Sequence, residues 1–317
     1  MKILYFDCFS GISGDMTIGA LLDAGGDFSY LKEELKKLSF DDEYTLEVQK
    51  VIKNGITATK FDVVLKHDNR PHTHEQHSEK GDQLNGHGHA HIHENEQTDY
   101  HGHGHHHHEE HSHGNHGHGH HHHGEHSHDN HGHSHRHHGG QAHHHRSYQD
   151  IVRMINGSDL SEKAKQMSLA IFKKIGESEG RIHGLPLEEV YFHEVGAVDS
   201  IIDIVGTAIL LDQLGVDKIV SAPVPVGSGR IHIAHGIYPV PAPATLDILK
   251  GIPIEHTDVR GELTTPTGAG IVAVLAETFG TLPAMKVTDI GYGAGTKTFA
   301  DRPNVLRVVI GEQDGQE

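Results

Sequence analysis

All but five of the 37 histidines of this chain lie in one internal tract, residues 67–145. Neutral imidazole is a common protein ligand for nickel, zinc and copper, so a segment this rich in histidine is expected to hold transition-metal ions. An inert linker or an expression tag is the alternative, but a tag is usually short, uniform and terminal, and this tract is long, irregular and internal. Its two four-histidine runs are the expected storage ligands: His105, His106, His107, His108, His120, His121, His122 and His123.

A second group of chemically capable residues follows the first apolar segment of the chain. Asp7 ends that segment, and a small glycine-rich turn leads from it to Asp15. Such a turn before a helix presents free backbone N–H groups to an anion, and the two carboxylates are expected to bind a cation shared with a phosphate. The turn has no lysine, so it is not a P-loop, and plain capping by Asp15 is the alternative. The residues expected to contact the phosphate are Ser10, Gly11, Ser13 and Gly14.

A third group surrounds His193-Glu194, which is followed closely by Asp199 and Asp203. Residues four apart lie on the same face of a helix, so the two carboxylates are expected to point the same way and to bind a metal ion. The ordinary interpretation is that Asp199 caps the helix and His193 is a satisfied core residue. The grouping of four such residues favours a site.

Two weaker signals come later in the chain. His235, three residues after His232, is a candidate metal ligand, although this spacing is common. Thr264 and Thr265 begin an expected helix and are candidate cofactor-binding residues, with simple helix capping as the alternative.

The pattern of apolar residues predicts the elements that position these groups. Strands are expected at residues 2–7, 44–48, 61–65, 218–226, 287–292 and 305–310, with Asn54-Gly55 as a type I′ turn. Helices are expected at about residues 16–22, from a capping box at Ser147 and Asp150, along 164–175, over 199–214, before Gly251, and from Thr265-Pro266 to Phe279. The fold class is therefore α/β or α+β, with a mixed sheet and flanking helices.

The division of the chain follows from the same pattern. Residues 1–66 form the first part of the α/β domain, residues 67–145 a His-rich insertion expected to be disordered, and residues 146–317 the rest of the domain. The net charge of −18 argues against nucleic acid and anionic membranes as partners. The single cysteine excludes a disulfide within one chain, and no signal peptide or membrane span is evident, so a cytoplasmic protein is expected.

Several long motifs together resemble one family, the LarC nickel-insertion proteins. They are Tyr5–Met16, Phe192–Gly206, His235-Gly236, Pro239–Thr245, Glu262–Gly268, Gly291–Gly295 and Arg302–Asn304. The resemblance implies a cyclometallase of the lyase class that inserts Ni²⁺ into pyridinium-3,5-bisthiocarboxylic acid mononucleotide. It implies consumption of CTP with Mg²⁺ or Mn²⁺, and delivery of the nickel-pincer nucleotide to lactate racemase.

The resemblance also implies a C-terminal domain, or a separate chain, that follows the segment seen here and is associated with CTP binding. His193 or Glu194 is then the candidate catalytic base. Two other functions remain open from the residues alone, a nickel or zinc store without catalysis and a metal-dependent nucleotide hydrolase.

Overall fold

A computed structural model describes residues 1–66, 146–192, 197–233 and 236–313 of the chain. The described residues before and after the histidine tract belong to one compact unit. The tract with its storage histidines, and also His193, Glu194 and His235, lie outside the described residues.

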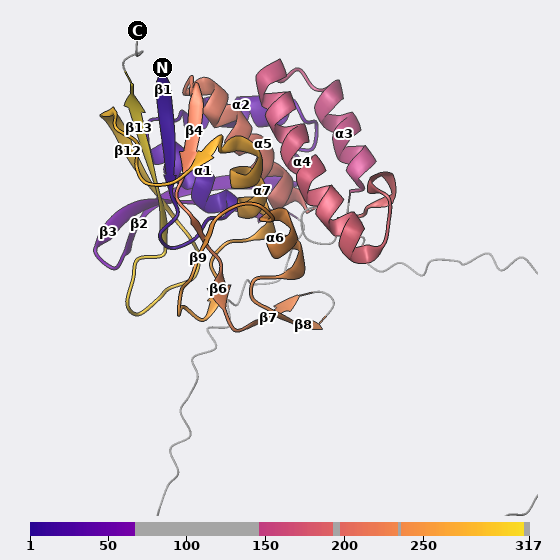
Figure 1. Cartoon of the computed structure of the whole chain (residues 1–317). Helices are drawn as coiled ribbons and strands as arrows, with labels where there is room; N and C mark the ends of the chain where they lie inside the picture. The colour runs from indigo at the N-terminus through magenta and orange to yellow at the C-terminus, as the bar shows by residue number, and fades with distance from the viewer. Residues whose placement is uncertain (67–145, 193–196, 234–235, 314–317) are drawn as a thin grey trace, which may run out of the picture. The chain divides into compact units, whose positions relative to one another are not determined.

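The framework of this unit is a mixed seven-stranded sheet with the order β11-β4-β1-β13-β12-β3-β2 (Figure 1). The pairs β1–β4, β4–β11 and β12–β3 are parallel, and β1–β13, β12–β13 and β2–β3 are antiparallel. A mixed sheet with helices against it confirms the predicted fold class. Its strands are β1 (Lys2–Asp7), β2 (Tyr44–Lys53), β3 (Ile56–Leu65), β4 (Lys218–Ser221), β11 (Thr278–Phe279), β12 (Lys286–Ala294) and β13 (Val305–Glu312).

The helices gather on one face of this sheet (Figure 1). They share the main apolar core with side chains from that face, among them Leu4 and Phe6 of β1 and Val308 of β13. No helix in the described part of the chain is long and apolar enough to cross a membrane. The helices are α1 (Gly14–Asp23), α2 (Phe28–Lys36), α3 (Tyr148–Gly157), α4 (Glu162–His183), η1 (Leu187–Glu189), α5 (Val198–Gln213), α6 (Pro243–Ile248) and α7 (Pro266–Leu275).

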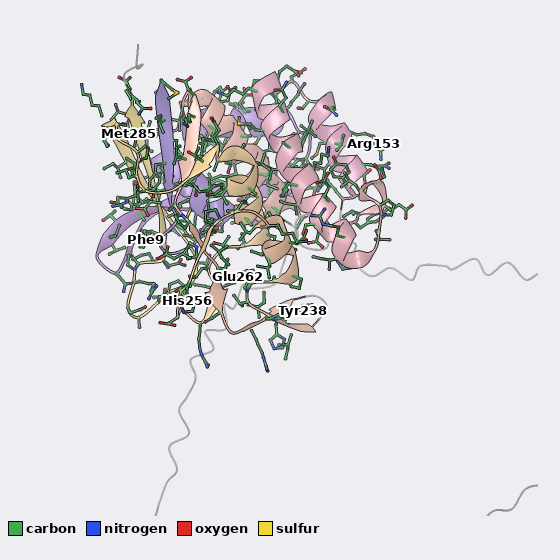
Figure 2. All side chains as sticks on the ribbon, viewed as in Figure 1. Phe9, Arg153, Tyr238, His256, Glu262 and Met285 are labelled. Atoms are coloured by element: carbon green, nitrogen blue, oxygen red, sulfur yellow. The ribbon has the colours of Figure 1, made fainter. Side chains whose placement is uncertain are left out.

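The other face of the sheet carries a smaller apolar cluster of Ile3, Tyr5, Val220 and Val309. Met285, labelled in Figure 2, packs against it. Short strand pairs complete the fold between β4 and α7. They are β5 (Val224–Pro225) with β9 (Ile254–Glu255), β6 (Gly227–Ser228) with β10 (Gly261–Glu262), and β7 (Arg230–Ile233) with β8 (Gly236–Pro239).

Local sequence signals account for several elements. Asn54 and Gly55 both have positive φ, at 44° and 84°, as the type I′ turn between β2 and β3 requires. The capping box at the start of α3 is formed by Ser147 and Asp150, as predicted. In both cases the residues that determine the geometry are adjacent in sequence.

Several predicted elements were wrong in extent. The helix expected to run to Phe279 ends at Leu275, because Thr278 and Phe279 pair with β4 as the edge strand β11. The strand expected over 218–226 is divided into β4 and β5, since Pro223 has no backbone N–H to continue the ladder. The first helix begins at Gly14, two residues early, and α2, capped by Asp27, was not predicted.

Helix α1 lies unusually close to the sheet. A Cβ atom built on Gly293 of β12 would lie 1.8 Å from the carbonyl oxygen of Met16, and one on Gly291 would lie 2.1 Å from that of Ala20. Both obstacles are backbone atoms of α1, so no side-chain rotation can relieve the clash. The absence of a side chain at these two positions therefore sets the distance between α1 and the sheet.

We expect Gly293→Ala to destabilise the protein by about 1–3 kcal/mol or more, as overpacking a rigid contact does. Denaturant unfolding would measure the change. Gly280→Ala is the matched control, because a Cβ atom there meets nothing within 4 Å. Equal stability of the two variants would show that the contact between α1 and β12 is soft.

Candidate functional site

A cavity of about 330 Å³ lies where the first turns of three helices meet strand β3. Ser13, Gly14 and Asp15 come from the start of α1, Asp199, Ser200 and Asp203 from the start of α5, and Thr265, Pro266 and Thr267 from the start of α7. Residues 60–63 of β3, with Glu262 and Thr296, complete the lining. Residues far apart in the sequence thus share one polar cavity.

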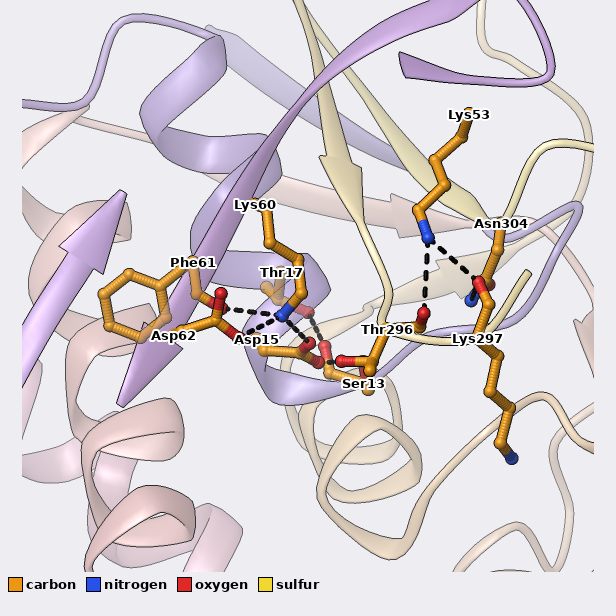
Figure 3. Close-up of polar contacts among 10 residues, drawn as sticks. All are labelled: Ser13, Asp15, Thr17, Lys53, Lys60, Phe61, Asp62, Thr296, Lys297 and Asn304. Atoms are coloured by element: carbon orange, nitrogen blue, oxygen red, sulfur yellow. Dashed lines mark hydrogen bonds and ion pairs between the residues drawn. The ribbon is translucent and has the colours of Figure 1, made fainter. Parts of the chain in front are cut away.

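Lys60 is the cation of this cavity, and sequence reasoning missed it. Its ammonium group lies 3.3 Å from Asp15 Oδ2, also contacts Asp62, and donates to the carbonyl oxygen of Phe61 at 3.1 Å (Figure 3). Burial lowers the pKa of Lys60, but the attraction of Asp15 and Asp62 outweighs it and leaves that pKa raised. Lys60 therefore stays charged and joins β3 to the start of α1.

The two α5 carboxylates face the cavity together, as their spacing of four predicted. Burial raises the pKa of Asp203 well above its usual range, and the negative charges of Asp15 and Asp199 raise it further. Burial also raises the pKa of Asp199, with Asp15 adding to it. The whole Asp199 residue is more exposed than Asp203, although its carboxyl group is close enough to the cavity wall for burial to act on it.

Asp203 is held against the first turn of α1. A Cβ atom on Gly14 would lie 2.3 Å from the Asp203 Cβ atom, so only glycine lets the carboxyl group approach the helix this closely. The backbone N–H of Asp15 partly offsets the rise in the pKa of Asp203. Asp203 Oδ1 is buried and has no hydrogen-bond partner among the described residues.

The six predicted cofactor-binding residues divide into two sets. Ser13, Gly14 and Thr265 line the cavity. Ser10 and Thr264 are fully buried, and their hydroxyl groups donate to the carbonyl oxygens of Pro303 and Pro225, both at 2.7 Å.

Gly11 has a φ of 93° and packs against the backbone of Leu263. The second set therefore joins the turn before α1 to the segment before α7. Their predicted contact with a ligand stays a prediction.

The predicted metal ligands are not all brought together. Asp15, Asp199 and Asp203 line the cavity, but Asp7 does not, because its carboxylate is paired with Arg307 at 2.7 Å. The expected cation shared by Asp7 and Asp15 therefore has no support in this geometry. Among the residues that the structure describes, no three His, Cys, Asp or Glu side chains are placed to hold a metal ion.

The described residues at both ends of the histidine tract meet at Glu43. The Lys66 backbone N–H donates to the Glu43 carbonyl oxygen at 2.9 Å, and Arg146 Nη2 lies 2.5 Å from Glu43 Oε1. Lys66 comes three residues after Val63 of the cavity. The Tyr148 backbone N–H donates to the carbonyl oxygen of Val190, close before His193 in sequence.

Asp203→Asn is expected to stabilise the protein, more at pH 8 than at pH 4. When the pKa of a carboxyl group is higher in the folded than in the unfolded protein, its protonated form favours folding. This contribution is fully present below the unfolded pKa of about 3.9 and is lost as the pH rises through the folded pKa. Asparagine cannot ionise, so it avoids this loss, at about 1.4 kcal/mol per unit of pKa difference. Thermal unfolding across pH would measure it. Asp289→Asn is the control, because Asp289 is an exposed residue of β12 and its replacement should leave the stability unchanged at every pH. An effect of Asp203→Asn that does not depend on pH would contradict the expected burial of charge.

Comparison with known proteins places the chain in a family. Residues 4–317 match the model of the family described as nickel insertion protein. The chain is 47% identical to the pyridinium-3,5-bisthiocarboxylic acid mononucleotide nickel insertion protein of Geobacillus kaustophilus, over 99% of this chain and 60% of that protein. It is 43% identical to the protein of the same name from Clostridium kluyveri, over 100% of this chain and 64% of that protein.

A putative nickel insertion protein of Geotalea uraniireducens is 40% identical, over 99% of this chain and 62% of its own length. No solved structure matches. The chain thus spans about three fifths of the length of these relatives. With a match that runs through both folded segments and all the cavity residues, the chain belongs to the nickel insertion protein family.

Proposed function

We propose that this chain carries out nickel insertion into pyridinium-3,5-bisthiocarboxylic acid mononucleotide, forming the nickel-pincer nucleotide. The observation that carries the proposal is the family match over residues 4–317, together with two relatives of that name that align with nearly all of the chain. In the reaction, a carbon–nickel bond and two sulfur–nickel bonds form, and the pyridinium C–H bond breaks. Sulfur donors on the substrate suit nickel, and imidazole can pass the ion on by ligand exchange.

Loss of the C–H proton requires a base, for which His193 and Glu194 are the candidates. Both residues precede α5 directly in sequence, and the first turns of α5 supply Asp199 and Asp203 to the cavity. One of these two residues would accept the proton. Of the ligands expected from the sequence, His235 remains a proposed metal ligand.

CTP with Mg²⁺ or Mn²⁺ is the proposed co-substrate, bound outside the described cavity. That cavity does not fit a triphosphate, because the described residues lining it include five acidic side chains and one lysine. We propose that a C-terminal domain or a separate chain binds CTP, that the reaction is of the lyase class, and that it occurs in the cytoplasm. Lactate racemase apoprotein is the proposed recipient of the product.

The histidine tract is proposed to store nickel and to supply it to the folded unit. A ligand tethered by a flexible segment has an effective concentration set by the tether, which can reach the millimolar range. The described residues that flank the tract, Lys66 and Arg146, both contact Glu43, and Lys66 comes three residues after the cavity residue Val63 in sequence. The tract would supply nickel to the folded unit whenever free nickel is scarce.

Deletion of residues 67–145 separates this proposal from a protein that only stores nickel or zinc. We expect the deleted chain, supplied with its C-terminal partner, to keep insertion activity at saturating nickel and to lose most of it at limiting nickel. The measurement is the rate of nickel-pincer nucleotide formation against nickel concentration. Loss of activity at every nickel concentration would favour pure storage.

His193→Ala should lower the insertion rate by about 100-fold or more, the usual range for a general base. His256→Ala is the matched control, since His256 is 90% exposed, and it should leave the rate unchanged. The assay is single-turnover insertion at saturating nickel with the C-terminal partner present. Full activity of His193→Ala would exclude His193 as the base, and nickel-independent release of pyrophosphate from CTP by the parent would favour a nucleotide hydrolase.

A further inference from the structure

We propose that the cavity at the starts of α1, α5 and α7 binds the ribose of the mononucleotide, with Asp199 and Asp203 as partners of its vicinal hydroxyl groups. This assignment rests on the proposed function, because it divides the substrate of that reaction among parts of the protein. It differs from the sequence-based expectation, which placed a phosphate and a metal ion here.

The charge of the cavity excludes the anionic parts of the substrate. Five acidic side chains among the described residues line it, and Lys60 is the only cation in that lining. Lys60 already contacts both Asp15 and Asp62. A phosphate or a thiocarboxylate placed here would face net negative charge at short range, which is unfavourable.

Part of the anion-binding capacity of the helix starts is already used within the protein. In α5 the Ser200 N–H donates to Asp199 Oδ1 at 2.8 Å, and in α7 the Gly268 N–H donates to Thr265 Oγ1 at 3.1 Å. The helix dipoles also stabilise the acids at the starts of α1 and α5, which keeps negative charge in the cavity.

Asp203 points to a ligand that donates hydrogen bonds. Its Oδ1 atom is buried and has no hydrogen-bond partner among the described residues, which is costly unless a donor is supplied, and rotation about the Cβ–Cγ bond exchanges its two oxygens.

Neutral hydroxyl groups fit this requirement. Asp199 lies one helical turn from Asp203 on the same face of α5, so two carboxyl groups are presented side by side. Acidic side chains commonly recognise ribose hydroxyls in this way in nucleotide-binding proteins. The phosphate and the reacting pyridinium ring must then lie outside this group of acids.

The test compares two probes, nicotinic acid mononucleotide and its 2′-deoxy form, by calorimetry with the full chain. We expect the ribose form to bind at least tenfold more tightly, the effect of about one hydrogen bond to a charged group. Asp199→Ala and Asp203→Ala should abolish this preference by weakening the ribose form alone. Asp199 is exposed, so its variant should fold even if Asp203→Ala does not, and Asp289→Asn should keep the preference.

Equal binding of both probes by the parent chain, or no binding of either, would overturn the ribose assignment. If the parent still inserts nickel in that case, the proposed function stands without it. Calorimetry with nickel alone on the chain lacking residues 67–145 gives the third outcome. Tight nickel binding that Asp199→Ala removes would make the cavity a metal site and would also overturn the assignment.

Discussion

The site depends on the close contact between helix α1 and strand β12. Gly293 and Gly291 leave no side chains in the interface, so the carbonyl oxygens of Met16 and Ala20 lie almost against the sheet. Because backbone atoms of α1 meet backbone atoms of β12, the distance between α1 and the sheet can change very little. Asp15, in the first turn, is thereby held within reach of Lys60 on β3.

Electrostatics then determine which chemistry the cavity permits. Acids stand at the starts of α1 and α5, where helix dipoles favour negative charge, and Lys60 neutralises only part of them. Burial without full pairing raises the pKa of Asp203, so this carboxyl group keeps its proton to higher pH than a surface aspartate does. The buried carboxyl group lowers the stability of the folded protein, as is common at sites that bind a ligand.

The histidine tract and the cavity suit different tasks. A segment rich in imidazole and poor in apolar residues can bind ions without fixed geometry, whereas bond formation requires groups held on rigid elements. Lys66 and Arg146, the described residues that flank the tract in sequence, both contact Glu43 of the folded unit.

The sequence by itself predicted the mixed sheet, the β2–β3 turn at Asn54-Gly55, the capping box of α3 and the common face of Asp199 and Asp203. Each of these depends on neighbours within a few positions, which periodicity and capping rules describe. The long motifs also predicted the family, which the comparisons confirm.

Only the tertiary structure decided which candidates meet. It separated Asp7, paired with Arg307, from Asp15, and it brought in Lys60, which looks in sequence like an ordinary strand lysine. It also gave Thr278 and Phe279 to the sheet rather than to a helix. The physical reason is the same in each case: the deciding partner lies tens to hundreds of residues away, so no local pattern of side chains carries the information.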